Sequence, residues 1–374
     1  MNVLHVHSGN LYGGVETFLL TLARSRELAP GMDMSVALCF EGRVARDLRA
    51  ARMMPVMLGE VRLRRPDKVR RARQELRSLL ATHSFDIAVC HQAWPHAVFG
   101  SVLKGAGIPL VSWVHMAQTG GHWLDRLAGR IEPDCYVCNS KYTASLLPPT
   151  NARVEVIYAP VAPHAPDASA FARTSPIATA DKPNAPIVIV QVSRMEAWKG
   201  QRVLLEALAR LRDVPEWECW FVGGAQRPAE ARFVETLQTT AAALEIADRV
   251  RFLGQRSDVS ELLTSADIFC QANIEPEAFG ISFVEAMYAG LPVVTSPMGG
   301  ALEILNDTCS VLVPPDDVSA LASALTGLLN NRAERERLGR SGAARAKALC
   351  NPATQMQQIA AVLESVAAMR VTAH

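Results

Sequence analysis

Two glutamates eight positions apart, Glu277 and Glu285 in the segment EAFGISFVE, form the clearest chemical pattern in this chain. Gly280 suits a tight turn, and the residues from about Ile281 onward predict a helix that ends at the following GLP sequence. The backbone N–H groups at a helix start form an anion site, whereas carboxylates accept hydrogen bonds from hydroxyls. This combination suits a ligand with both phosphates and hydroxyls, such as a nucleotide sugar.

The same segment resembles the E-x7-E signature of family 4 glycosyltransferases, the group 1 transferases, which retain the anomeric configuration of the sugar. The resemblance implies that Glu277 faces the hydroxyls of the donor sugar and that Glu285 holds the nucleotide ribose. It also places the donor against the turn made of Phe279, Gly280, Ile281 and Ser282. The spacing alone also fits an ordinary helix with two solvated glutamates. The Phe-Gly step and the GLPVV sequence that follows make the match more specific.

Two basic residues, Arg194 and Lys199, follow the first predicted strand of the second half in the sequence SRMEAWKG. Ligands bind at the carboxyl ends of strands in parallel sheets, so both cations could neutralise a diphosphate there. Taken alone, they are equally well two solvated surface cations. The spacing matches the Arg-x4-Lys-Gly element of the family, and this resemblance assigns both residues to the diphosphate, where they would act in place of a metal.

Three glycines at predicted strand ends extend the resemblance. Gly13 and Gly14 join the first strand to the first helix, where paired glycines let a ligand approach the backbone or simply form a turn. They resemble the family's Gly-Gly-x-Glu element, which lines the donor phosphates and the acceptor entrance. Gly223 follows a strand of the second half, and by resemblance it borders the nucleotide.

His115 ends the predicted strand at 110–114, where a histidine is commonly a structural or surface residue. In the family, a histidine at this place touches the donor sugar and the acceptor side, and the resemblance gives this role to His115. Met116 follows it, where many members carry Asp. His91, after another strand, is a weaker candidate.

The elements that position these residues predict an α/β fold. Short apolar strands alternate with helices in two blocks, which indicates two doubly wound parallel sheets. We expect a first domain at 1–165, a Pro- and Ala-rich linker at 166–186, a nucleotide-sugar domain at 187–350, and a C-terminal helix at 351–374 that could pack back on the first domain. The resemblance implies the GT-B architecture, in which two Rossmann-like domains face a central cleft.

Composition excludes several classes of protein. With 38 Lys and Arg against 37 Asp and Glu, the net charge of +1 argues against a nucleic-acid partner. No apolar run reaches membrane-spanning length and the first residues lack a signal-peptide pattern, so we expect a cytoplasmic protein. Cys135 and Cys138 form a lone C-x-x-C in a strand, which fits buried reduced thiols better than a metal site. We expect no metal and no cofactor beyond a nucleotide-diphosphate sugar as substrate.

A basic helix is predicted at 66–82. Between residues 60 and 82, eight basic residues stand against three acidic ones, although the whole chain carries only +1. Its apolar stripe could cover the protein's own sheet, or residues 62–77 could dock on an anionic membrane or a lipid-diphosphate acceptor.

These patterns lead to one expected function with two alternatives. We expect a retaining, metal-independent glycosyltransferase that moves a sugar to a glycan or lipid-linked acceptor of the cell envelope, at the inner face of the membrane. A transferase with a small soluble acceptor and a catalytically inactive GT-B scaffold remain alternatives. The intact charged residues argue against the scaffold.

Overall fold

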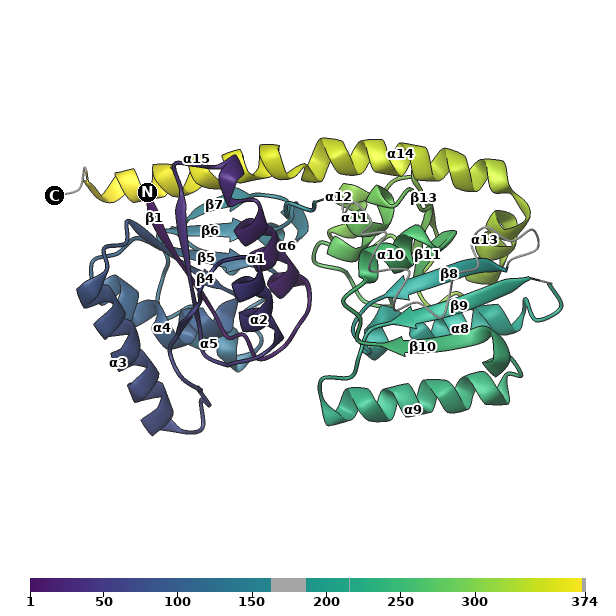
Figure 1. The fold of residues 1–374 in the computed structure, drawn as a ribbon, viewed down its shortest axis with the longest axis horizontal. Helices are drawn as coiled ribbons and strands as arrows, with labels where there is room; N and C mark the ends of the chain where they lie inside the picture. Colours follow the sequence, from purple (N-terminus) through teal and green to yellow (C-terminus); the bar gives the residue numbers. More distant parts are fainter. Residues whose placement is uncertain (163–185, 215, 372–374) are drawn as a thin grey trace. The chain divides into compact units, whose positions relative to one another are not determined.

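The computed structural model describes residues 1–162, 186–214 and 216–371, and the chain divides into two compact units. The first unit combines residues 1–161 with 350–374, and the second contains residues 162–349 (Figure 1). The chain therefore leaves the first unit and returns to it near its C-terminus. The predicted linker at 166–186 lies outside the described residues, except for its last residue.

A parallel sheet of seven strands forms the centre of the first unit. Its strands are β1 (Asn2–His7), β2 (Asp33–Leu38), β3 (Val56–Met57), β4 (Ile87–His91), β5 (Leu110–Val114), β6 (Cys135–Cys138) and β7 (Arg153–Val156). Their order is β3-β2-β1-β4-β5-β6-β7, so the chain builds from β1 to one edge and then from β4 to the other. The strand order reverses between β1 and β4, which is where parallel sheets of this kind bind ligands.

Helices cover both faces of this sheet. They are α1 (Gly14–Arg24), η1 (Arg26–Leu28), α2 (Arg43–Ala50), α3 (Pro66–Thr82), α4 (Ala93–Gly105), α5 (Trp123–Ala128), α6 (Lys141–Ser145) and α15 (Pro352–Val371). Leu20 of α1 and Leu48 of α2 are buried in the cluster on one face. Leu76 of α3 and Phe99 of α4 belong to the cluster on the other face. Residues from both faces thus form the core of the unit.

The C-terminal helix α15 belongs to the first unit. The Val161 N–H donates to the Cys350 carbonyl at 3.0 Å, and Arg153 Nη1 donates to Ser365 Oγ at 2.8 Å. Met356, Ile359 and Leu363 are fully buried. The helix is therefore an integral part of the core of the first unit.

The second unit is built on a six-stranded parallel sheet. Its strands are β8 (Ile187–Val192), β9 (Trp217–Val222), β10 (Val250–Gly254), β11 (Ile268–Gln271), β12 (Val293–Thr295) and β13 (Ser310–Leu312). The order β10-β9-β8-β11-β12-β13 reverses between β8 and β11. Both units are therefore doubly wound α/β folds, as the alternating sequence predicted.

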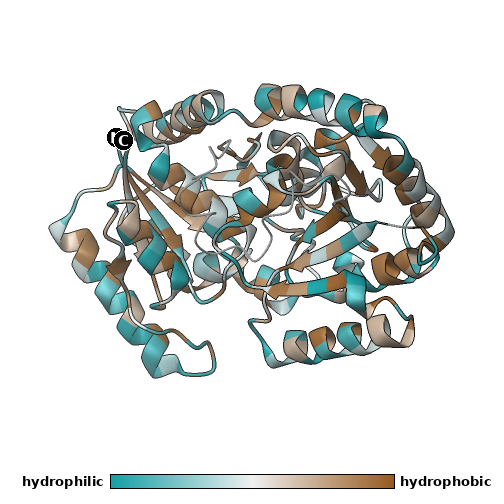
Figure 2. Ribbon diagram, turned by 45° about the vertical axis from the view of Figure 1, so that its right-hand side comes forward, coloured by the Kyte–Doolittle hydropathy of each residue, from teal (hydrophilic) through white to brown (hydrophobic). Residues whose placement is uncertain are grey.

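Helices also flank the second sheet. They are η2 (Ala197–Lys199), α8 (Gln201–Ala209), α9 (Pro228–Ala243), η3 (Ala247–Arg249), α10 (Val259–Thr264), α11 (Ile281–Tyr288), α12 (Ala301–Ile304), α13 (Val318–Asn330) and α14 (Arg332–Cys350). Leu204 of α8, Leu237 of α9 and Leu325 of α13 share one buried cluster with the strands. Figure 2 shows hydrophobic residues concentrated in the strands of both sheets, whereas the helices alternate hydrophobic and hydrophilic residues.

The predicted basic helix forms α3, with Pro66 in its first turn. Ala72, Leu76 and Leu79 are buried, and Val69 and Leu80 pack against the same core cluster. The apolar stripe therefore covers the protein's own sheet, which was one of the two options open from the sequence.

Helix α14 was missed by sequence reasoning. Its segment is rich in charged residues and alanine and contains Gly339 and Gly342, which lower helix propensity. The structure gives one reason for Gly339: a Cβ there would lie 1.8 Å from the Gly290 carbonyl oxygen, at the turn that follows α11. A side chain at Gly342 would meet Met287 at an ordinary 3.4 Å.

The two α14 glycines make a matched pair of tests. Gly342→Ala should raise the free energy of unfolding by about 0.5–1 kcal/mol, because alanine is the better helix former and fits. Gly339→Ala should lower it by roughly 1–3 kcal/mol, because the backbone contact with Gly290 must open. Urea denaturation of both variants measures the difference. Equal stabilisation by the two alanines would contradict the close helix packing.

Candidate active site

The loops that leave β8 and β11 meet where the strand order of the second unit reverses. Lys199 lies in the first loop and Glu277 in the second, and the Lys199 Nζ is 2.5 Å from Glu277 Oε2. The same carboxylate oxygen accepts from Asn273 Nδ2 at 3.3 Å and from Gln271 Nε2 at 3.4 Å. Three donors therefore hold this nearly buried carboxylate in one orientation.

The backbone of Glu277 is held as firmly as its side chain. Its carbonyl accepts the Gly300 N–H at 2.8 Å, and it forms a parallel bridge with Gly299. On the other side of the ion pair, the Lys199 ammonium lies 3.8 Å from the centroid of the Trp198 ring. The Lys199–Glu277 pair is thus part of the rigid structure around the strand ends.

Arg194 is also paired with carboxylates. Its Nη2 lies 2.8 Å from Glu196 Oε1 and 2.7 Å from Glu230 Oε1, and Glu230 Oε2 accepts the Gln226 N–H at 2.7 Å. Sequence reasoning predicted the two cations but missed Glu196 and Glu230. The position of Glu230 in the first turn of α9 was the available signal. With Lys199 and Glu277, these five side chains carry a formal net charge of −1.

Gly223 lets two strand ends approach closely. Its φ is +150°, and a Cβ there would lie 1.9 Å from the carbonyl oxygen of Ser193, the residue before Arg194. Its N–H donates to the Gly254 carbonyl at 2.8 Å. A side chain at this position would push the Arg194 loop away from β9.

Gly280 starts helix α11 in a left-handed conformation, with φ +94°. A Cβ there would lie 2.3 Å from the Phe283 ring, so glycine is required at this turn. The amides of Ile281 and Ser282 have no hydrogen-bond partner among the described residues, and they form the N-terminus of the helix. The Phe279 side chain is buried, so this residue can present only its backbone to a ligand.

Glu285 lies one turn further along α11. Its carboxylate is partly buried and makes no hydrogen bond or ion pair with any residue that the structure describes. Burial raises its pKa to about 7. It is therefore an acceptor that is poorly solvated and without a donor, the arrangement expected of a carboxylate that binds a ligand hydroxyl.

The candidates of the first unit lie at the ends of β1, β4 and β5. Gly13 caps α1 and Gly14 is its first, exposed residue. Glu16 in the same turn bonds His7 through Oε1 and Nε2 at 2.7 Å, and both side chains are buried. The Gly-Gly turn is thus tied to the end of β1 by a buried hydrogen bond.

His115 follows β5 and belongs to a series of histidines. Its Nε2 is 2.9 Å from His91 Nδ1, and His91 Nε2 is 2.9 Å from His5 Nδ1. Burial lowers the pKa of His5 and of His115 to about 3, and burial with the neighbouring histidine charges lowers the pKa of His91 well below its usual range. All three imidazoles are neutral at pH 7. Sequence reasoning named His115 and His91 but missed His5.

The two halves of the chain match two family descriptions. Residues 12–164 match the family described as Glycosyltransferase Family 4, and residues 176–345 match Glycosyl transferases group 1. The chain belongs to this glycosyltransferase family. The E-x7-E segment and the Arg-x4-Lys-Gly segment lie inside the second match.

Several named relatives are mannosyltransferases. A phosphatidyl-myo-inositol mannosyltransferase of Mycobacterium leprae is 39% identical over 40% of this chain, and the match spans only 38% of that protein. A GDP-mannose-dependent alpha-(1-6)-phosphatidylinositol monomannoside mannosyltransferase of Mycolicibacterium smegmatis is 29% identical over 89% of both chains. The lipopolysaccharide core mannosyltransferase LpsB of Rhizobium meliloti is 27% identical over 46% of this chain and 50% of its own length.

Solved structures agree on the fold. HepE of Anabaena in complex with UDP-glucose has a TM-score of 0.82 at 23% identity, covering 98% of this chain and 100% of that chain. WaaG, a glycosyltransferase involved in lipopolysaccharide biosynthesis, has a TM-score of 0.72 at 18% identity, covering 97% and 99%. The family member described here therefore has the GT-B fold that the sequence predicted.

The predicted residues of this glycosyltransferase fall into two groups. The second unit brings Lys199 together with Glu277 in one ion pair and holds Arg194 beside Glu196 and Glu230. The first unit carries Gly13, Gly14 and His115. Cys135 and Cys138 are buried free thiols, and burial raises the pKa of both to about 12.

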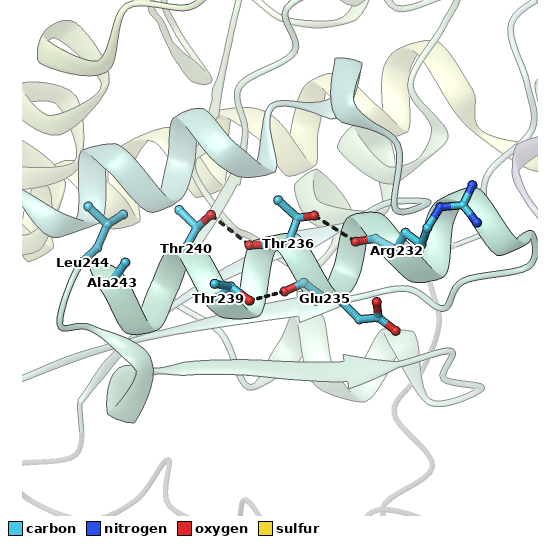
Figure 3. Close-up of a pocket in the computed structure, with 7 residues that line it drawn as sticks. All are labelled: Arg232, Glu235, Thr236, Thr239, Thr240, Ala243 and Leu244. Carbon is cyan, nitrogen blue, oxygen red and sulfur yellow. Dashed lines mark hydrogen bonds between the residues drawn. The ribbon is translucent and has the colours of Figure 1, made fainter.

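A surface depression of about 580 Å³ lies along α9, and none of the residues that line it is a predicted site residue (Figure 3). The hydroxyls of Thr236, Thr239 and Thr240 donate to carbonyls of their own helix at 2.8–2.9 Å, so they could offer a ligand only acceptor oxygens. Over the described ranges, no group of three His, Cys, Asp or Glu side chains is arranged to hold a metal ion.

The raised pKa of Glu285 predicts a pH-dependent stability. The folded protein keeps a proton that the unfolded chain releases, so this contribution is present below about pH 4.5 and is lost as pH rises through about 7. Glu285→Gln removes the ionisation. The free energy of unfolding of Glu285→Gln minus that of the wild type should therefore grow by about 2–3 kcal/mol as the pH rises from 5 to 8.

Urea denaturation at both pH values measures this change, with Glu235→Gln on the exposed face of α9 as the matched control. The control should follow the wild type. Parallel pH curves for wild type and Glu285→Gln would rule out the desolvated carboxyl group.

Proposed function

We propose that this protein is a retaining glycosyltransferase that transfers a sugar from a nucleotide-diphosphate sugar to an envelope glycolipid or lipid-linked glycan. The observation that carries the proposal is the Lys199–Glu277 pair, held where the strand order reverses. The unpaired amides of α11 lie just beyond it in the chain. The Glu277 carboxylate can accept hydrogen bonds from ligand hydroxyls, and the amides that follow it in the sequence can bind an anion.

The donor would be bound by groups of complementary chemistry. The sugar hydroxyls donate to Glu277, and the ribose hydroxyls donate to Glu285, which otherwise lacks a donor in the described structure. The diphosphate lies against the amides of Ile281 and Ser282. Arg194 and Lys199 contribute positive charge to the same group.

The ion pairs modify the simple picture of two free cations. Because the five charged side chains sum to −1, a diphosphate can only be stabilised if Lys199 or Arg194 shares its N–H groups with it. The carboxylates then keep both cations in place before the donor arrives. Such preorganisation stabilises charge that develops on the leaving group.

The geometry favours a same-face displacement over a covalent intermediate. Glu277 is bound by Lys199, Asn273 and Gln271, which makes its carboxylate a weak nucleophile. In the displacement, the bond between the anomeric carbon and the diphosphate oxygen breaks while the acceptor oxygen bonds to the same face. The acceptor proton passes to the leaving phosphate oxygen, so no protein base and no metal is required.

The class of acceptor is proposed from the relatives. The Mycobacterium and Mycolicibacterium proteins are named for phosphatidylinositol acceptors, and the Rhizobium protein for the lipopolysaccharide core. These acceptors share a lipid anchor and a sugar or polyol hydroxyl. We infer an acceptor of the same kind, which would be met at a membrane surface.

Helix α3 could supply that membrane contact. Three of its arginines, Arg70, Arg71 and Arg77, are exposed and have no ion-pair partner in the part of the chain that the structure describes, and the same is true of Arg64 just before the helix. Arg62 and Lys68 are paired with Glu60, and Arg65 with Asp67. Because the apolar stripe is buried in the core, docking would be electrostatic, without insertion. No helix in the described residues is long and apolar enough to span a bilayer.

A donor-binding and transfer assay tests the proposed function. Calorimetric titration with GDP-mannose and UDP-glucose should identify a donor that binds, and transfer should give a product with the donor's anomeric configuration. Lys199→Ala and Glu285→Gln should each weaken donor binding roughly tenfold or more, because the first removes a charged donor and the second replaces a carboxylate acceptor with a neutral amide. EDTA should leave turnover unchanged.

Lys104→Ala, which removes an ion pair with Asp134 in the first unit, is the matched control and should bind donor normally. Inversion at the anomeric carbon would exclude the retaining reaction. A strict need for a divalent metal would contradict the role of the cations, and failure to bind any nucleotide sugar would favour an inactive scaffold.

The membrane contact has its own test in vesicle co-sedimentation. Changing Arg64, Arg70, Arg71 and Arg77 to Gln should weaken binding to phosphatidylserine or phosphatidylglycerol vesicles roughly a thousandfold, at about 1 kcal/mol per arginine. Wild-type binding should fall as salt rises. A charge-matched variant of four exposed arginines elsewhere, Arg24, Arg46, Arg130 and Arg232, should sediment like wild type. Equal loss in both variants would show that only net charge matters.

A further inference from the structure

Three histidines on or next to adjacent strands of the first sheet form a hydrogen-bonded series. His5 is on β1, His91 ends β4, and His115 follows β5, and these three strands are neighbours in the sheet. The series therefore crosses the point where the strand order reverses. Both nitrogen-to-nitrogen distances are 2.9 Å.

Strand alternation explains why these polar rings are buried together. On β1, Leu4 and Val6 face the cluster beneath α3 and α4, so His5 and His7 face α1. There Phe18 of α1 lies 5.8 Å from the His91 ring and 5.1 Å from the His115 ring. The histidines are thus enclosed by aromatic side chains and can bond mainly to one another.

The middle histidine, His91, determines which ring nitrogen carries the proton in each of the three histidines. A neutral imidazole has one N–H and one bare nitrogen. If His91 donates from Nδ1 to His115, it must accept from His5 at Nε2, and all three rings carry their proton on Nδ1. If His91 instead donates from Nε2 to His5, all three carry it on Nε2. No other order makes both hydrogen bonds.

His5, at the buried end of the series, distinguishes between the first order, with all protons on Nδ1, and the second, with all protons on Nε2. His5 Nε2 is fully buried and has no partner among the described residues. In the second order it would be an N–H without an acceptor, and in the first it is a bare nitrogen. Buried donors without a partner are rarer in proteins than under-satisfied acceptors, so the first order is favoured.

The exposed end of the series, His115, is then a hydrogen-bond donor. His115 retains 9% of its surface, and its Nδ1, which has no partner among the described residues, keeps some contact with solvent. With the proton on Nδ1, the ring presents an N–H to whatever lies beside β5. It has no bare nitrogen there to accept a proton.

We propose that His5 and His91 are positioning residues that hold His115 as the Nδ1–H tautomer, so that His115 donates a hydrogen bond to a sugar oxygen and does not act as a base. This inference rests on the proposed function, because it assigns His115 to the sugar. The proton of the acceptor hydroxyl must then leave by the phosphate of the leaving group.

The proton order can be read directly in the wild-type protein. Long-range 1H–15N correlation spectra of protein labelled with 15N-histidine distinguish Nδ1–H from Nε2–H rings. Neutral Nδ1–H rings should be found for His5, His91 and His115 at pH 7. A proton on Nε2 of His115, or a charged ring, would overturn the proposal without reference to any activity.

A pair of variants tests the positioning role. His5→Asn keeps an amide N–H donor near the place of Nδ1, whereas His5→Phe keeps a ring but removes the donor. The Phe variant should show a mixture of His115 tautomers and a fall in kcat on the order of tenfold, with an unchanged KM for the donor sugar. The Asn variant should restore both the single tautomer and kcat.

The outcomes separate the two proposals. Equal kcat in the Phe and Asn variants, with thermal unfolding showing both folded, would overturn the positioning role. If His5→Phe does not fold, the wild-type spectrum still decides the proton order, and the kcat of His5→Asn decides whether a donor at this place suffices. A wild type that transfers no sugar but shows Nδ1–H rings would overturn the proposed function and not the proton order.

Discussion

The reversal of strand order in each parallel sheet is the constraint on which the other features depend. Between β8 and β11, and again between β1 and β4, the chain departs in opposite directions from neighbouring strands. The loops that follow cannot cover each other, and their side chains are left together at the carboxyl edge of the sheet. Lys199 and Glu277 meet in the loops of the first reversal, whereas His5 and His91 meet on the adjacent strands β1 and β4 of the second. Residues far apart in sequence are neighbours for this reason.

Polar groups are buried in different ways at the two places where the strand order reverses. In the second unit, the charges remain but are paired, and each pair gains further hydrogen bonds, as Glu277 does from Asn273 and Gln271. In the first unit, burial keeps the histidines neutral, and they form hydrogen bonds with one another. Paired charges can be shared with an incoming anion, whereas neutral rings can only orient hydrogen bonds. The first arrangement suits diphosphate binding, and the second suits selection among sugar oxygens.

Glu285 and the start of α11 differ from both the paired charges and the neutral histidines. They are polar groups without partners in the described structure, and burial raises the pKa of the carboxyl group to about 7. Leaving such groups unsatisfied costs folding free energy. A ligand that supplies hydroxyl donors and phosphate acceptors recovers that energy on binding. Gly280 makes this arrangement possible, because its positive φ turns the chain into the helix without a side chain above the Phe283 ring.

Sequence alone determined the alternating α/β pattern, helix α3 at its observed bounds, and the motif residues of the two charged segments. These are local properties, since hydrophobic period, turn glycines and motif spacing are written in neighbouring residues. It missed α14, whose interior glycine is explained by a backbone contact with Gly290, far away in the chain. It also missed Glu196, Glu230 and His5, since their partners come from other elements or from side-chain directions that spacing does not reveal. Only the tertiary structure could decide which charges are paired, which carboxylate lacks a donor, and which way three histidines pass their protons, because those depend on contacts between strands that are distant in sequence.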